Sequence, residues 1–215
     1  MRAEIRRGLD KKHKESLVHL FCSIFPEVIV PVFGSVERCA RLLEDSLASD
    51  RILTAIADEQ LLGFAGLHFS GREWFNPSLS QLLRVMRWGT VRVMAMGIIL
   101  FRRPGKDSLH LDTLAVHPDV RGRGIGTQLI DAVLARAQTE GKRFVTLEVE
   151  DINPRVKRLY ERLGFVSDRF ERLPWPWRKA FAFSGAYCMA KNVARADRDV
   201  YSEESSSTIW KPSSK

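Results

Sequence analysis

A glycine-rich segment between an apolar strand and an amphipathic helix restricts the fold of this chain more than any other feature. Residues 121–126 read RGRGIG; they follow a strand-like run at residues 109–116 and open a helix that runs to about Glu140. Backbone N–H groups at a helix N-terminus favour an anion, and glycines let the backbone approach a ligand closely. The segment therefore predicts a phosphate-binding turn. A tight turn whose glycines serve only packing is the alternative.

The spacing of these glycines differs from two common phosphate-binding patterns. A Walker A loop ends in Gly-Lys-Ser/Thr, and the chain has no such ending here. A dinucleotide-binding turn has the spacing G-x-G-x-x-G near the first strand of its domain. Gly122, Gly124 and Gly126 instead give G-x-G-x-G in the middle of the chain. Neither of these two classes of site is predicted.

Length and composition describe one globular domain. The 215 residues are 45% hydrophobic and 28% charged, which is ordinary for a packed domain. The net charge of +8 allows phosphorylated cofactors, nucleic acid or anionic lipid as partners. Three cysteines without a CxxC pair favour neither a zinc site nor a disulfide framework. Residues 1–15 lack the apolar core of a secretory signal, so we expect a cytoplasmic protein.

The apolar spacing predicts alternating helices and strands from residue 3 to residue 192. Pro26 is expected to stop the first helix and Gly164 the last, with Ser35 and Asn153 as N-caps. The expected strands are residues 3–9, 51–57, 61–69, 109–116, 143–149, 165–170 and 186–192, and the expected helices are residues 11–25, 35–47, 121–140 and 153–162.

Residues 70–108 interrupt this pattern. They hold seven basic and two acidic residues together with Trp74 and Trp88, and their apolar residues suggest one or two short helices. The apolar run at residues 93–101 is too short to span a bilayer. Three interpretations remain: a lid over an acceptor site, a dimerisation surface, or a basic surface that faces a membrane or nucleic acid. The polar, Ser-rich residues 194–215 predict a flexible tail.

Two segments together resemble the GNAT superfamily of acyl-CoA-dependent N-acyltransferases. LAVHPDVRGRGIGTQLI is similar to motif A, and NPRVKRLYERLGF, in which Tyr160 follows Asn153, is similar to motif B. The order of expected elements also matches over residues 3–192, interrupted at residues 70–108. The resemblance implies an α/β (α+β) fold with a mixed, mostly antiparallel sheet, splayed in the middle, and helices on both faces. It also implies a single domain over residues 1–193 that carries the insertion.

The resemblance implies acetyl-CoA as the cofactor and assigns residues to hold it. Backbone N–H groups of the glycine-rich segment would bind the pyrophosphate. The preceding strand would pair with the pantetheine arm and polarise the thioester carbonyl. Asn153 would contact the arm, and Val156, where the motif usually has Ala, would narrow its channel. The expected cofactor-binding residues are Leu114, Ala115, Val116, Arg121, Gly122, Arg123, Gly124, Ile125, Gly126, Thr127, Asn153 and Tyr160.

Acetyl transfer to a primary amine needs a base, because most amines are protonated at neutral pH. Glu148 is our first choice, on a strand face that also carries Glu150. Asp112 and Glu150 are the alternatives. By the resemblance, Tyr160 would protonate the departing thiolate. The TLEV segment, taken with this Glu and Tyr, is also similar to N-acetyltransferases that modify the terminal alanine of a ribosomal protein.

The sequence constrains the identity of the amine acceptor less than that of the cofactor. Trp175, Trp177 and Arg178 lie on the loop between the last two expected strands, which in the superfamily often lines the acceptor pocket. Arg178 would favour an acceptor with an acidic group. The expected acceptor is a small-molecule amine or a peptide N-terminus; no metal is implied, and homodimers are common in such folds. A non-catalytic acyl-CoA sensor and an enzyme acting on a nucleic-acid-linked amine are the alternatives.

Two histidines and one cysteine near the expected site are given no catalytic role. His110 and His117 flank the strand at residues 109–116 and are expected at the surface or in a turn. Cys188 lies on the last expected strand. A covalent acyl-cysteine route would need a base beside this thiol, and the sequence shows no sign of one.

Overall fold

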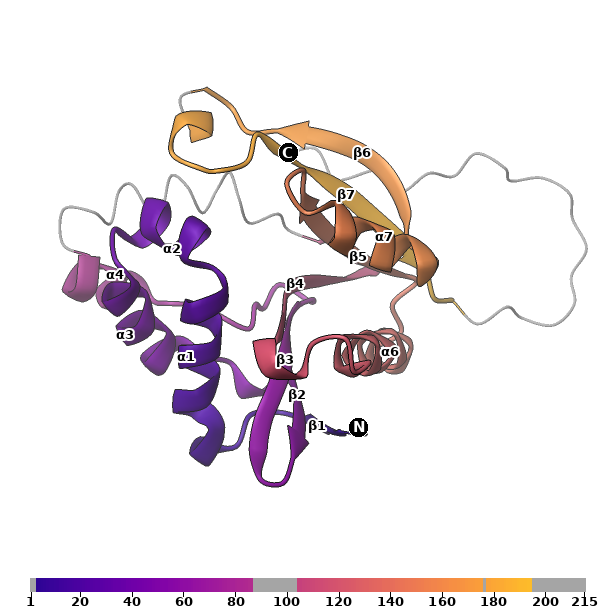
Figure 1. Cartoon of the computed structure of the whole chain (residues 1–215), viewed down its shortest axis with the longest axis horizontal. Helices are drawn as coiled ribbons and strands as arrows, with labels where there is room; N and C mark the ends of the chain where they lie inside the picture. Colours follow the sequence, from indigo (N-terminus) through magenta and orange to yellow (C-terminus); the bar gives the residue numbers. More distant parts are fainter. Residues whose placement is uncertain (1–2, 87–103, 176, 195–215) are drawn as a thin grey trace, which may run out of the picture.

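A seven-stranded mixed sheet forms the centre of the computed structural model, which describes residues 3–86, 104–175 and 177–194 (Figure 1). The strands are β1 (Glu4–Arg7), β2 (Ile52–Ala57), β3 (Gln60–His68), β4 (Ser108–Val116), β5 (Phe144–Glu150), β6 (Val166–Arg172) and β7 (Gly185–Asn192). Their order in the sheet is β1-β2-β3-β4-β5-β7-β6. Only β4 and β5 pair in parallel, and the other neighbours are antiparallel. The predicted mixed, mostly antiparallel sheet is confirmed.

Helices cover both faces of this sheet, as predicted (Figure 1). On one face lie α1 (Lys14–Ile24), α2 (Pro26–Phe33) and α3 (Val36–Ser46), with α4 (Leu79–Met86) packed against α3. On the other face lie α6 (Ile125–Thr139) and α7 (Pro154–Arg162). The short 3₁₀ turns are η1 (Lys11–His13), η2 (Ser49–Arg51), η4 (Pro118–Val120) and η5 (Trp177–Lys179).

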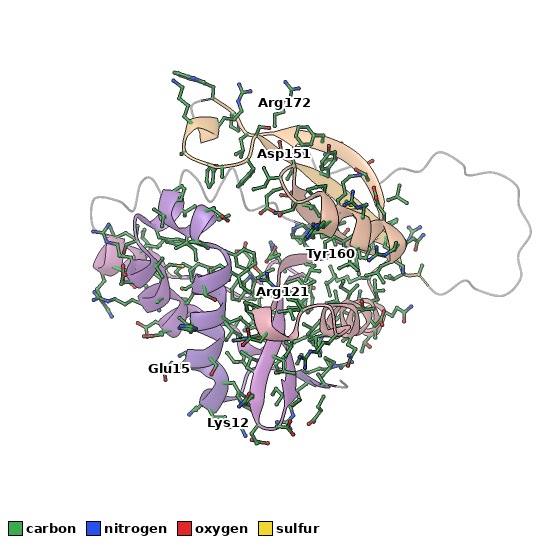
Figure 2. All side chains as sticks on the ribbon, in the orientation of Figure 1. Lys12, Glu15, Arg121, Asp151, Tyr160 and Arg172 are labelled. Carbon is green, nitrogen blue, oxygen red and sulfur yellow. The ribbon has the colours of Figure 1, made fainter. Side chains whose placement is uncertain are left out.

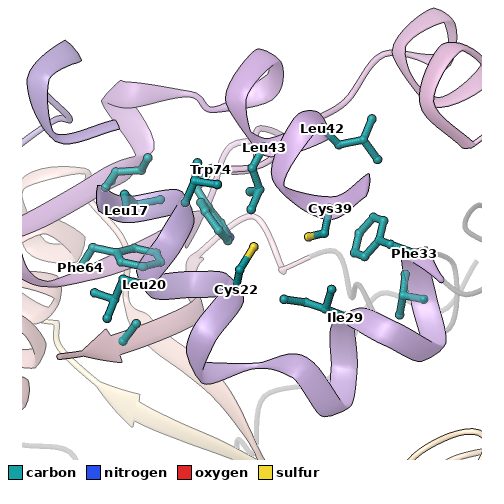
Figure 3. Close-up of a cluster of buried hydrophobic side chains, with 14 of the residues drawn as sticks. Leu17, Leu20, Cys22, Ile29, Phe33, Cys39, Leu42, Leu43, Phe64 and Trp74 are labelled. Atoms are coloured by element: carbon teal, nitrogen blue, oxygen red, sulfur yellow. The ribbon is translucent and has the colours of Figure 1, made fainter. Parts of the chain in front are cut away.

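Strand alternation divides the buried side chains into two cores, one on each face of the sheet. The α1–α3 core includes Leu17, Ile29, Cys39, Leu43, Phe64 and Trp74 (Figure 3). The α6–α7 core includes Leu67, Leu109, Leu129, Val133, Leu147 and Tyr160. Because β2, β3 and β4 each contribute side chains to both cores, this part of the sheet is anchored from both sides and can hold a precise site.

The helix α2 was missed by the sequence interpretation. Pro26 does not only follow the end of α1 at Ile24; it is also the first residue of α2. Proline suits this position because its fixed φ is helical and its missing N–H is not needed there. Gly34, with φ 80°, ends α2. Ser35 then caps α3 as predicted, since its hydroxyl accepts from the Arg38 N–H at 3.3 Å.

The insertion is only partly described. Its first portion contains α4, which agrees with the predicted short helix. Trp74 is buried in the α1–α3 core, in ring contact with Phe21 and Phe64, so it is not part of a basic surface as one interpretation required. Trp88 and the apolar run at residues 93–101 lie outside the described residues, as does most of the Ser-rich tail.

Two thiols that lie 17 residues apart in sequence face each other inside the α1–α3 core. Figure 3 shows Cys22 of α1 and Cys39 of α3 with their sulfur atoms turned toward one another. The hydrogen bond between them lowers the pKa of Cys22, and together with burial it raises the pKa of Cys39. The sequence spacing gave no indication of this contact, because it depends on how α1 and α3 pack.

The N-terminal helices are apolar but short. Within the described residues, no single helix has the length and apolar composition needed to cross a membrane. The segments Lys11–Ile24 and Pro26–Phe33 meet that requirement only jointly, as a pair bent by 94°.

Candidate functional site

The strands β4 and β5 form a fork. Their parallel ladder covers four residue pairs and ends at Leu111↔Leu147. Beyond that pair β4 continues along β3, and β5 continues along β7, so the two strands diverge. The predicted splay in the middle of the sheet is confirmed. The first residue beyond the ladder is Asp112 on β4 and Glu148 on β5, so a carboxyl group stands on each arm at the apex of the fork.

A β-bulge lies at the same point of β4. Gly66 of β3 pairs with Thr113, whereas Leu67 pairs with Leu111, which leaves Asp112 as the extra residue. A bulge shifts the phase of side-chain alternation and re-aims a side chain. Here Leu111 before the bulge and Leu114 after it both contact the α6–α7 core. The simple alternation used in the sequence interpretation could not predict this bulge.

The surroundings of Asp112 favour the neutral form of its carboxyl group. Its side chain is only 10% exposed. Burial raises the pKa of Asp112 well above its ordinary value, and the nearby carboxylates of Glu73 and Glu148 raise it further.

One histidine lies beside this carboxyl group, and two others lie on β3 and at the end of β4. His110 of β4 lies with Nε2 3.6 Å from Asp112 Oδ1 and Nδ1 2.9 Å from Thr146 Oγ1, and its side chain is largely buried. The expectation that His110 lies at the surface or in a turn was wrong. His117, at the end of β4, is exposed as expected. His68 of β3 is buried with Nδ1 3.7 Å from Glu73 Oε1. No group of three potential metal-ligating side chains occurs among the described residues.

Glu148 and Glu150, the two candidate bases on β5, have different hydrogen-bond partners. Cys188 of β7 lies directly opposite Glu148, and its Sγ donates to Glu148 Oε1 at 4.0 Å. A carboxylate therefore does lie beside this thiol, contrary to the sequence interpretation, which could not see the β5–β7 register. Glu150 instead accepts a hydrogen bond from Asn153 Nδ2 at 2.9 Å. The Asn153 side chain thus binds Glu150 and does not cap α7.

The glycine-rich segment leads from β4 into α6. Gly122 and Gly124 have φ values of 77° and 81°, which favour glycine, and Gly124 is the N-cap of α6. The α6 N-terminus has no side-chain cap and no acidic residue in its first turn. A Cβ on Gly122 would meet nothing within 4 Å. These features fit an anion bound by backbone N–H groups at the helix N-terminus.

The strand that leads into this segment carries the three residues expected beside the pantetheine arm. Leu114 and Val116 are half-buried and Ala115 is buried. The Val116 carbonyl already accepts a hydrogen bond from Arg121 Nε at 3.2 Å. His117 N–H donates to the Leu62 carbonyl of β3, so by strand alternation the backbone of Ala115 faces β3 and that of Leu114 faces the fork. The backbone groups of Leu114 are therefore the better candidates for pairing with a ligand along the fork.

Tyr160 lies on the opposite face of the sheet from Glu148. It projects from α7 into the α6–α7 core, where its ring meets that of Phe165 edge-on with centroids 5.6 Å apart. Figure 2 shows Tyr160 on α7 and Arg121 at the loop that enters α6. Burial raises the pKa of Tyr160, and the Glu150 carboxylate raises it further. The phenol is therefore protonated at neutral pH.

The β6–β7 loop packs through residues that the sequence interpretation did not single out. Leu173, Phe181 and Phe183 are buried and belong to the α1–α3 core. Trp175 is 71% exposed, and Arg178 is also exposed. The backbone of Trp177 lies in η5, but its side chain is outside the described part of the structure. The expectation that Trp175, Trp177 and Arg178 line the acceptor pocket stays a prediction.

Comparison with known proteins agrees with this geometry. Residues 15–165 match the model of the "Acetyltransferase (GNAT) family". A probable N-acetyltransferase camello from Xenopus tropicalis is 37% identical over 81 residues, which are 38% of this chain and 37% of that protein. A ribosomal-protein alanine N-acetyltransferase from Salmonella typhimurium is 34% identical over 70 residues, 33% of this chain and 47% of that protein. The chain thus spans less than half the length of these relatives.

A solved structure extends the likeness to most of the chain. The structure of "histone acetyltransferase HPA2 and related acetyltransferase" from Corynebacterium glutamicum covers 89% of this chain and 96% of its own. Its TM-score is 0.63 and its sequence identity is 19%. At that identity the comparison concerns the fold alone.

Proposed function

Since the chain belongs to the GNAT acetyltransferase family, we propose that it transfers an acetyl group from acetyl-CoA to a primary amine by direct attack in a ternary complex. One observation carries this proposal: the β4–β5 fork has a carboxyl group on each arm and opens beside an uncapped, glycine-rich helix N-terminus. Such an arrangement brings an anion-binding site and a proton acceptor to the same opening in the sheet.

The donor side of the fork is the face covered by α6 and α7. Backbone N–H groups of residues 121–126, with the Thr127 hydroxyl, would hold the pyrophosphate of acetyl-CoA. Backbone groups of Leu114 would pair with the arm, and one N–H aimed at the carbonyl oxygen would stabilise the charge that develops there. Acetyl-CoA supplies the activated acetyl group as a thioester.

The base we assign is Glu148. An amine reaches the site mainly as an ammonium ion, so a carboxylate must take one proton before the nitrogen attacks, directly or through a water. Asp112 is a poorer candidate because its raised pKa favours the protonated form, which cannot accept a proton. Glu150 is engaged by the Asn153 amide. Glu148 remains, at the apex of the fork and on the face opposite the donor side.

The acid we assign is Tyr160. A departing thiolate needs a proton, and the buried phenol carries one at neutral pH. Tyr160 faces the α6–α7 core, and Glu148 lies on the other face of the sheet. These two proton transfers would therefore occur on opposite sides of the fork, one on the donor and one on the acceptor. The second proton that the nitrogen loses as the amide forms returns through water to Tyr160 and restores its phenol.

Paired substitutions test this assignment. Glu148→Gln and Tyr160→Phe are each expected to lower amine-dependent thiol release by about 10²- to 10⁴-fold, the usual contribution of a positioned acid or base. Affinity for CoA, measured by calorimetry, should stay within a few-fold of wild type. Tyr187→Phe, on the same sheet face as Tyr160, is the matched control and should retain turnover.

Three outcomes would count against the proposal. Unchanged turnover in Glu148→Gln and Tyr160→Phe would show that other groups move the protons. Tight CoA binding by the wild type without turnover of any amine would favour the acyl-CoA sensor. Turnover restricted to aminoacylated RNA would favour a nucleic-acid-linked acceptor.

A further inference from the structure

The Cys22–Cys39 pair of the α1–α3 core is a cluster of reactive groups that the proposed acetyl transfer does not use. Cys22 is 8% exposed and Cys39 is fully buried. Figure 3 shows their sulfur atoms turned toward one another, and the two thiols share a hydrogen bond. The third cysteine, Cys188, lies on β7 and faces Glu148. Cys22 and Cys39 are therefore the two thiols that the fold places to react with each other.

The packing of α1 against α3 brings these two thiols together. Cys22 lies near the C-terminal end of α1, and Cys39 lies at the end of the first turn of α3. The helix α2 connects α1 to α3, and its Ile29 is buried in the same core as Leu43 of α3. Thiols already in contact need only a small rearrangement to bond, whereas thiols that point apart need the backbone to move. The native core therefore favours a bond between them.

Cys22 is the thiol that an oxidant reaches first, because it is the more exposed of the two. Its hydrogen bond with Cys39 lowers the pKa of Cys22, whereas burial and the carboxylates of Glu37 and Glu44 act in the opposite direction. The thiolate is the form of cysteine that attacks an oxidant. The hydrogen bond with Cys22 and burial raise the pKa of Cys39, so this thiol keeps its proton. Cys22 is thus the attacking thiol, and Cys39 is the thiol that closes the disulfide.

We propose that Cys22 and Cys39 form a reversible disulfide when the protein meets a hydroperoxide, so that the pair is a redox-modification site that links α1 to α3. The linked segment, residues 22–39, contains all of α2. The three helices cover the face of the sheet that carries Glu148. Oxidation would therefore brace the helical layer on that face.

Hydrogen peroxide, the simplest such oxidant, accounts for every atom and electron of the reaction. The Cys22 thiolate attacks one peroxide oxygen and the O–O bond breaks. This step gives a sulfenic acid on Cys22 and hydroxide, which takes up the proton that the Cys22 thiol released. The Cys39 sulfur then attacks the Cys22 sulfur, the S–O bond breaks, and the hydroxyl group leaves as water with the Cys39 proton. Two thiols thus lose two electrons to one peroxide, and the products are one disulfide and two water molecules.

Peptide mapping after peroxide treatment tests the pairing directly. Trypsin cleaves after Lys14, Arg38 and Arg41, so Cys22 falls in peptide 15–38 and Cys39 in peptide 39–41. Native protein is treated with hydrogen peroxide, denatured with an alkylating agent and digested. Mass spectrometry should find the two peptides joined and lighter by two hydrogen atoms, and a dithiol reductant should separate them.

The melting temperature gives a second readout. A disulfide stabilises a protein mainly by restricting the unfolded chain, so oxidation should raise the melting temperature by about 5–10 °C. Cys22→Ala and Cys39→Ala should give no joined peptide and no rise, and thermal unfolding of each variant before oxidation checks that it is folded. Cys188→Ala is the matched control, and it should form the joined peptide as the wild type does.

Glutathione redox buffers separate a bond favoured by the fold from chance cross-linking. The fraction of wild-type protein with the Cys22–Cys39 disulfide is measured against the ratio of oxidised to reduced glutathione, once in native buffer and once in concentrated urea. If the native core brings the thiols together, the disulfide should be at least about tenfold more stable in the folded protein than in the unfolded chain.

Two results would overturn the proposal. Folded wild-type protein that yields no joined peptide after peroxide treatment would exclude the disulfide. A disulfide that is no more stable in native buffer than in urea, or that lowers the melting temperature, would show that the native core opposes it. Because none of these measurements uses acetyl-CoA, they stand apart from the test of the proposed acetyl transfer.

Discussion

Asp112 and Glu148 are the first residues beyond the last rung of the β4–β5 ladder, and their environments differ. Burial and two neighbouring carboxylates raise the pKa of Asp112, and the Cys188 thiol donates to Glu148. When two neighbouring carboxyl groups have environments that push their pKa values apart, they commonly divide acid and base roles between them. The raised pKa of Asp112 therefore favours Glu148 as the base.

This division predicts unequal effects of two isosteric substitutions. Asp112→Asn replaces a neutral carboxyl with a neutral amide and should lower kcat/KM by no more than about fivefold, because no proton-accepting group is lost. Glu148→Gln removes the base and should lower it by about 10²-fold or more. Steady-state thiol release at several pH values measures both. A larger loss in Asp112→Asn than in Glu148→Gln would transfer the role of base to Asp112.

The protonation of Asp112 also predicts a pH dependence of stability. Its pKa is raised in the folded protein, so its contribution is complete below the unfolded-state pKa of about 3.9 and is lost as pH rises through the folded pKa. The Asp112→Asn variant has no carboxyl group to titrate at this position, so it does not undergo this loss of stability. The melting temperature of the variant relative to wild type should therefore rise between pH 4 and pH 9. Asp131→Asn, at an exposed position on α6, should show no such trend; a flat difference for Asp112→Asn would mean that Asp112 is ionised.

At the scale of elements, α6 and its entry loop form the anion-binding part of the site. Two glycines with positive φ flank this helix: Gly124 at its N-cap and Gly141 just beyond its C-terminal end. An added Cβ has at least 4.0 Å of space at both positions, so the cost of alanine at each is mainly backbone strain of about 1–2 kcal/mol. Alanine variants of Gly124 and Gly141 can therefore distinguish general destabilisation of the fold from loss of ligand binding.

Gly124→Ala and Gly141→Ala are expected to lower the melting temperature by similar amounts. Only Gly124→Ala should weaken CoA binding, by about tenfold, because strain of that size at the N-cap turns the N–H groups away from the phosphates. Calorimetric titration with CoA measures the difference. Equal CoA affinity in the two variants would mean that the α6 N-terminus does not hold the pyrophosphate.

The elements themselves were largely predictable from local patterns, and the failures share one cause. Ser35 as N-cap and Gly164 as terminator follow from local chemistry, and the structure has both. The α2 helix was missed because Pro26 has two meanings: it ends one helix and begins another. The bulge at Asp112 depends on β3, which lies distant in sequence.

The parts of the candidate site that depend on local sequence were also predictable, and those that depend on tertiary contacts were not. The motif resemblance predicted the glycine-rich segment and the splayed sheet, because the motifs consist of residues close together in sequence. The His110–Asp112 and Glu148–Cys188 contacts depend on bulge and register. Trp74 reads as a surface residue from its basic neighbours, yet it fills the space above Gly66, where a Cβ would lie 2.6 Å from its ring. Single-sequence patterns cannot specify such tertiary contacts.

At the scale of the whole molecule, the fork connects the two faces of the sheet. Donor-side residues belong to the α6–α7 face, whereas Glu148 lies on the face of the α1–α3 core. Acetyl-CoA and the amine would therefore approach from opposite sides and meet between β4 and β5. Such an arrangement favours a ternary complex over a route in which the enzyme carries the acetyl group alone.

Direct attack predicts that Cys188 carries no acetyl group, although Glu148 lies beside it. Cys188→Ala should keep turnover within a few-fold of wild type, since it removes only a weak donor to Glu148. Wild-type protein should not exchange label between acetyl-CoA and free CoA when the amine is absent. Mass spectrometry and isotope exchange measure the two expectations. Amine-independent exchange that is lost in Cys188→Ala would establish a covalent route instead.

Amine-dependent release of CoA thiol tests the central claim most directly. Purified protein is assayed with acetyl-CoA against small amines, amino acids and peptides, including amines with a carboxylate because Arg178 is exposed on the β6–β7 loop. The account predicts thiol release with at least one amine, matched by an acetylated product and abolished in Glu148→Gln. Tight acetyl-CoA binding with no amine-dependent release across the panel, or equal release by wild type and Glu148→Gln, would contradict it.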